Sequence, residues 1–136
     1  MATSGDWIES VLTLVRAHFE HPVLFGRQVS GPDLKPPFVV VSPPDDQFDA
    51  NGQAFTRTWS LDVWVRRGVD GDMQSIVKAY NDTDAFARHL LASPQPSDSW
   101  VLDAPVFVDS VGASDIEVES DDLFVIEMTL YQTLEI

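Results

Sequence analysis

The sequence predicts an α+β fold, a mostly antiparallel four-stranded sheet with two helices packed on one face. Two segments place apolar residues at helical spacing, and four segments alternate apolar with polar residues or are rich in β-branched ones. They follow one another as helix, strand, strand, helix, strand, strand, an order in which consecutive strands favour antiparallel pairing. With 136 residues, 44% of them hydrophobic, residues 1–136 are expected to form one domain.

Both helices are predicted from an apolar stripe. The first is expected to begin near Asp6, where Thr3 and Asp6 form a capping box, and to end near His21, because Pro22 disfavours helical geometry there. The core face of this first helix is predicted to hold Ile8, Val11, Leu12, Val15 and Phe19. The second helix is expected over residues 73–92, with one side lined by Ile76, Tyr80, Thr83, Ala87 and Leu90.

The first two strands are predicted over residues 38–42 and 55–67, separated by a long acidic loop at residues 43–54. The second strand is the clearest, and its core face is expected to hold Phe55, Arg57, Trp59, Leu61, Val63 and Val65. Its other face carries Asp62, Trp64 and Arg66. Because Trp and Arg are enriched among interface hot spots, we predict that this face contacts an adjacent subunit. The last two strands are expected from pieces within residues 101–118 and from residues 123–134, joined by a turn at residues 120–122.

Negative charge is concentrated in the second half of the chain. Residues 1–67 hold 6 bases and 8 acids, a net charge of −2, whereas residues 68–136 hold 2 bases and 14 acids, a net charge of −12. This excess disfavours binding to nucleic acid or to an anionic membrane surface. We expect either a solvated acidic surface or a surface that repels an anion such as DNA. The acids expected in such a loop or channel wall are Asp45, Asp46, Asp49, Asp115, Glu117, Glu119, Asp121 and Asp122.

The sequence lacks motifs for catalysis or cofactor binding. It has no cysteine, no Gly-x-Ser-x-Gly and no glycine-rich phosphate loop. Residues 47–58 imitate a calcium loop only in part, because Gln47 and Thr58 stand where two main ligands belong. His18 and His21 could share a helix face, but zinc would need a further ligand. We therefore expect no enzyme, no cofactor and no metal, and no apolar run is long enough for a membrane span.

Several short strings together resemble the tail terminator proteins of bacteriophages with long, non-contractile tails. These strings are the helix over residues 6–12, the segments 36–41 and 58–65, the second helix with Tyr80 and Phe86, and a closing β-hairpin. The resemblance covers nearly the full length in element order, size and acidity.

The resemblance implies a structural protein of the virion, made in the bacterial host cytoplasm. Proteins of this family assemble as a hexameric ring that caps the head-proximal end of the tail tube, stops its growth and joins the tail to the head–neck complex. The implied partners are further copies of the chain, the tail tube protein and a head-completion or neck protein, while DNA passes through without specific binding. The alternatives are another head–tail connector or neck-completion protein, and a monomeric acidic binding domain.

Overall fold

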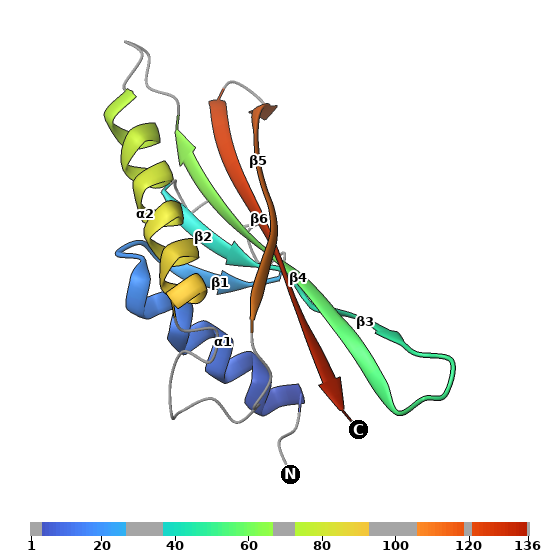
Figure 1. Ribbon diagram of the computed structural model, residues 1–136. Coiled ribbons are helices and arrows are strands. Elements are labelled where there is room, and N and C mark those ends of the chain that lie inside the picture. The colour runs from blue at the N-terminus through green and yellow to red at the C-terminus, as the bar shows by residue number, and fades with distance from the viewer. Residues whose placement is uncertain (1–3, 27–36, 67–72, 93–105, 119–120, 136) are drawn as a thin grey trace.

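The computed structural model describes residues 4–26, 37–66, 73–92, 106–118 and 121–135. The elements in chain order are α1 (Ser4–His18), β1 (Val23–Phe25), β2 (Phe38–Val41), β3 (Asp45–Phe48), β4 (Ala54–Arg66), α2 (Met73–Ala92), β5 (Phe107–Val118) and β6 (Asp121–Glu135). Both helices lie on the same face of the sheet, as expected (Figure 1). We call this the covered face, and the opposite one, on which the described residues place no helix, the bare face.

The sheet has six strands and is mixed, so the predicted four-stranded sheet and element order are wrong in detail. Its order is β1-β2-β4-β6-β5, and β3 pairs with β4 beyond the end of β2. The two unexpected strands are short. β1 has three residues and runs parallel to β2, and β3 has four exposed residues within the segment 43–54 that was expected to be a loop. Strands of this length carry too little alternation to be recognised in a sequence.

The centre of the sheet is a long antiparallel ladder between β4 and β6, from the pair Ala54–Glu135 to the pair Arg66–Leu123. β5 is one continuous strand with an irregularity between Val108 and Ser110, where separate pieces were predicted. The predicted piece at residues 101–102 lies outside the described residues, as does residue 120 of the predicted turn. Asp121 and Asp122 already belong to β6.

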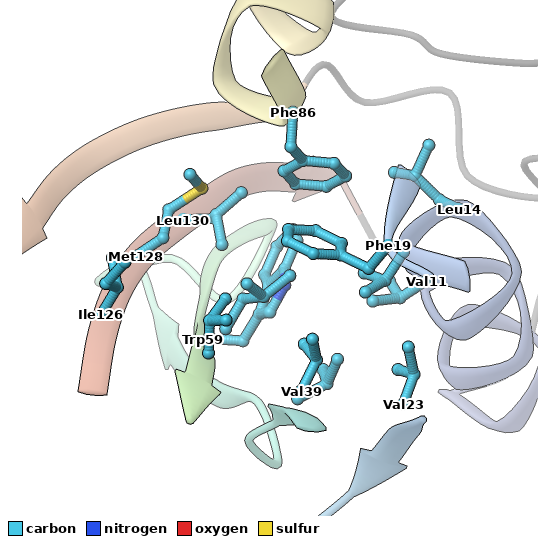
Figure 2. Packing of buried hydrophobic residues seen from close by; sticks show 14 of the residues in the cluster. Val11, Leu14, Phe19, Val23, Val39, Trp59, Phe86, Ile126, Met128 and Leu130 are labelled. Atoms are coloured by element: carbon cyan, nitrogen blue, oxygen red, sulfur yellow. The ribbon is translucent and has the colours of Figure 1, made fainter. Parts of the chain in front are cut away.

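The hydrophobic core lies between the covered face and the two helices (Figure 2). Trp59, Leu61 and Val63 of β4 are buried there as predicted. In α1 the buried stripe is centred one position earlier than expected. Its buried members are Trp7, Val11, Leu14 and Val15, whereas Ile8 and Leu12 are only partly buried. The buried side of α1 packs against β1 and β4. The spacing of the apolar residues alone does not specify which side of the helix is buried.

α2 has the predicted bounds, and Ile76, Thr83 and Leu90 of its predicted stripe are buried, but Phe86 takes the core position expected of Tyr80. Phe86 is buried, whereas Tyr80 is 37% exposed and rests its ring 5.8 Å from that of Phe124. α1 ends at His18, ahead of the predicted end, and Phe19 continues the core just beyond it. The predicted capping residue Thr3 lies outside the described residues.

A polar cluster is buried where the β3–β4 hairpin leaves the body of the sheet. Arg57 donates two hydrogen bonds to Asp46, from Nε at 2.8 Å and from a terminal nitrogen at 2.9 Å. Its guanidinium lies 4.8 Å from the ring centroid of Trp7, and Trp7 Nε1 donates to Gln132 Oε1 at 2.8 Å. These contacts join α1, β3, β4 and β6, so they hold the hairpin at a defined angle to the domain.

Candidate subunit-binding surface

The residues predicted to form a subunit contact lie together on the bare face. Asp62, Trp64 and Arg66 alternate along β4 with the buried core residues, so the strand places all three side chains opposite the helices. Trp64 is half-buried and stacks on Phe38, with ring centroids 5.8 Å apart and 18° between the planes. It is therefore not the lone exposed aromatic that the alternation suggested. Whether this face contacts a subunit stays a prediction.

The stack marks an apolar area on the bare face that the sequence pattern did not reveal. Phe38 and Val40 of β2 and Val125 of β6 are buried, and they lie in the same or adjacent cross-strand rows as Trp64. All four residues of β2 are buried. A strand buried on both faces reads as an uninterrupted apolar run, so the string Phe38–Val41 was the signal that could have revealed this area.

Asp62 is the electrostatically unusual group of this surface. Its Oδ1 is buried, and no described residue makes a hydrogen bond to it. Burial, with the carboxylate of Glu127 as the second cause, raises the pKa of Asp62 from 3.8 to about 6. Asp62 and Glu127 are direct cross-strand partners on β4 and β6. Two neighbouring carboxylates without a cation between them are destabilising, so the surface favours a positively charged partner.

A hollow lies beside Glu127, one of these two carboxylates. The row across the bare face runs from Val40 through Asp62 and Glu127 to Gly112 on the edge strand β5. The hollow measures about 300 Å³ and is lined by Ser110, Val111, Gly112, Ala113, Ser114 and Glu127. A Cβ atom added to Gly112 would meet no atom within 4 Å, so the missing side chain leaves open space there. Only strand register joins Gly112 to Glu127 and Asp62, so neither of these partners could be found from the sequence.

Aromatic side chains flank the hollow along the bare face. Phe107 of β5 and Tyr131 of β6 are cross-strand partners with ring centroids 5.4 Å apart. Phe107 is 43% exposed, and Tyr131 is half-buried. On the other side of the carboxylates from this aromatic pair, Trp64 lies in the adjacent cross-strand row. The surface thus combines two carboxylates, a recess and aromatic rings, the groups that receive a guanidinium through charge and stacking.

The acids predicted to form one loop or channel wall are spread over different environments. Asp46 is held by Arg57, and Asp49 Oδ1 accepts a hydrogen bond from the backbone N–H of Gln53 at 3.0 Å. Asp45 is exposed on β3, and Asp115 is exposed on the covered side of β5. Glu119 lies outside the described residues, as do the side chains of Glu117, Asp121 and Asp122. That these acids line a channel stays a prediction.

The turn of the β3–β4 hairpin accounts for the partial calcium-loop pattern. Gly52 has a φ of 66°, and its N–H donates to the Asp49 carbonyl at 3.1 Å. A left-handed φ favours glycine without any ion, so Asp49 and Gly52 serve a turn.

The described residues contain no group of three or more His, Cys, Asp or Glu side chains placed to hold a metal ion. His18, which was considered with His21, instead has its ring 4.4 Å from that of His89 on α2. Burial and the neighbouring His18 lower the pKa of His89. No helix in the described ranges has the length and apolar character that a membrane crossing requires.

Comparison with known proteins yields a structural likeness only. No family model matches the chain, and no curated protein matches its sequence. One similar solved structure is a chain of the "Virion of native gene transfer agent (GTA) particle". The two share 18% sequence identity with a TM-score of 0.55, and the match covers 89% of this chain and 84% of the other. At this identity the likeness shows a shared fold.

Proposed function

We propose that this protein is a structural component of a phage-like virion and that it acts as a tail terminator. In this role, copies of the chain form a hexameric ring on the last ring of the tail tube, stop its growth and bind a head-completion or neck protein. DNA passes through the ring without specific binding, and the protein is not an enzyme. The observation that carries the proposal is the fold shared with a chain of a virion over 89% of this chain.

Two features of the molecule support a role in assembly. The bare face presents the area around Asp62, Trp64 and Arg66, and we propose that it lies against an adjacent subunit. The acidity of the chain, with a net charge of −14, suits a wall along which DNA slides without adhering. Asp45 and Asp115, exposed on the described strands, are candidates for such a wall.

The test is to measure the mass of the purified protein over its accessible concentration range and to image it by negative-stain electron microscopy, alone and with its tail tube protein. We expect a closed ring of one stoichiometry with a central channel. The ring forms either in the purified protein or on the end of the tail tube. A neck-completion protein would bind the head-side partner and leave tube length uncontrolled. A protein that stays monomeric in both mixtures and leaves the tube unaltered would contradict the proposal.

A further inference from the structure

We infer that the partner of the bare face is the outer side of α2 in a second copy of this chain, with Arg88 entering the hollow beside Asp62 and Glu127. The inference rests on the proposed ring, and it names the two surfaces that would meet at each subunit contact. One of these surfaces belongs to the sheet and the other to the helix layer on the opposite side of the domain.

Within the described ranges, no positive charge lies at the centre of the bare face. Asp62 has a buried oxygen that accepts no hydrogen bond from the described residues, and Glu127 lies beside it. The hollow at Gly112 is lined by Glu127, the cross-strand partner of Asp62, and is large enough for the end of a long side chain. An arginine there would supply donors to both carboxylates and would lie near the aromatic rings of the face.

The described bases point to α2 as the source of that arginine. Arg57 is buried in its pair with Asp46, Lys78 is held by Asp82 and Glu20, and Arg66 lies on the bare face itself. Arg16 and Arg88 remain, both exposed on the helix layer. Of these two, Arg88 belongs to the helix with unburied apolar side chains.

These apolar side chains form a second stripe on α2, beside the stripe that packs in the core. The residues at positions 73, 77, 80, 84, 88 and 91 follow one another at helical spacing along one flank. Met73, Val77, Tyr80 and Leu91 of this flank are exposed large hydrophobic residues, with Leu91 at 76% exposure. A helix that presents two apolar stripes is typically packed between two layers, and the residues that the structure describes provide only one of them.

The two surfaces are complementary in charge and in apolar character. The flank of α2 offers Arg88 among apolar side chains, and the bare face offers two carboxylates among Trp64, Phe107 and Tyr131. A contact between different surfaces of identical chains is head-to-tail, and it generates a ring where the rotation closes.

The chain has no cysteine, which makes cross-linking a direct test. The double variant Asp84→Cys with Ser114→Cys places one thiol on the α2 flank and one beside the hollow, both at exposed positions. Mild oxidation of the full chain, under whichever condition the wild-type chain forms rings, alone or with its tail tube protein, is expected to give a ladder of disulfide-linked species that ends at one closed size. The control Ala17→Cys with Ser114→Cys moves the helix-layer thiol to exposed α1 and is expected to give no ladder. Equal cross-linking in the control, or none in the test variant, would overturn the inference.

Charge exchange tests the assigned pair. Asp62→Lys and Arg88→Glu should each weaken self-association by about 30-fold or more, because each places like charges at the contact. Mixing the two variants should restore association, since the introduced lysine of one chain then meets the introduced glutamate of the next, and the native pair forms at the following contact. The mixed ring must alternate the two variants. Failure of the mixture to associate, where the wild-type chain does, would reject Arg88 as the partner.

Gly112→Val is the variant that leaves the fold intact. Its side chain enters open space on an exposed strand, so thermal stability should not fall, whereas association should weaken by about tenfold or more because the hollow is filled. Rings that form equally well with Gly112→Val would show that the hollow is not part of the contact, while the proposed tail-terminator function would stand. If the wild-type chain formed no ring, either alone or on the tail tube, that result would instead contradict the proposed function.

Discussion

The two faces of β4 differ in how completely a single chain satisfies their side chains. On the covered face Trp59 is 4% exposed, and its ring meets Trp7 edge-on with centroids 5.0 Å apart. On the bare face, five residues further along, Trp64 is half-buried against Phe38. The same strand also places Arg57 in a paired, buried site and Asp62 in a site with an unsatisfied oxygen.

The difference is consistent with a covered face that stabilises the fold and a bare face that makes the proposed contact. A buried polar group without a hydrogen-bond partner destabilises a monomer. Such a group is therefore expected where another molecule supplies the partner, or where the loss of folding free energy is small. The covered face has a partner for each polar group described above. We therefore expect substitutions on the covered face to reduce stability, and those on the bare face to affect association more than stability.

The largest effect is expected from Trp59→Ala. This change removes a fully buried aromatic ring and its contact with Trp7, so the free energy of unfolding should fall by about 3–5 kcal/mol. Urea denaturation followed by circular dichroism measures it. Leu91→Ala, at the exposed end of α2, is the control and should change stability by less than about 0.5 kcal/mol. Similar losses in the two variants would undermine the division between faces.

Asp46→Ala should reduce the free energy of unfolding by about 2 kcal/mol. The substitution leaves the buried Arg57 guanidinium without its carboxylate partner, and the side chain of Asp46 is itself 28% exposed, which limits the loss. Chemical denaturation of Asp46→Ala, Arg57→Met and the double variant closes a double-mutant cycle. A coupling energy near zero would show that the pair does not hold the hairpin.

Trp64→Ala should cost the monomer about 1–2 kcal/mol, which is less than Trp59→Ala, because only the stack on Phe38 is lost. Association should weaken by about 30-fold, the effect of truncating an interface hot spot. The comparison requires melting temperature and oligomer mass on the same samples. If Trp64→Ala reduced the free energy of unfolding more than Trp59→Ala, the bare face rather than the covered face would be the main hydrophobic core.

Asp62→Asn should have the smallest effect on stability, with the opposite sign. Folding raises the pKa of Asp62 from 3.8 to about 6, so the folded chain binds more protons than the unfolded chain between these values. Stability therefore falls as the pH rises through this window, and ionised Asp62 is destabilising at neutral pH. After allowance for solvent screening, Asn should gain about 1 kcal/mol at pH 7 and nothing below about pH 4. Thermal melts across this pH range measure the gain, and an equal gain at every pH would refute the titration of Asp62.

The long elements of this protein could be predicted from its amino-acid sequence. The bounds of α2, the alternation of β4 and the burial of Trp59, Leu61 and Val63 follow from periodicity, because burial on one side leaves a repeat of 3.6 or 2 residues. Arg57 could also be located among the core residues, although Asp46 as its partner could not.

The short strands β1 and β3, the rotation of α1 toward Trp7 and the composition of the bare face instead depend on tertiary packing. Three or four residues carry no usable period, and the side of a helix that is most deeply buried depends on the neighbours it meets. The row from Val40 through Asp62 and Glu127 to Gly112 joins strands that are far apart in the chain. Such a row depends on register, and pairing across a sheet is a long-range property that local sequence does not encode.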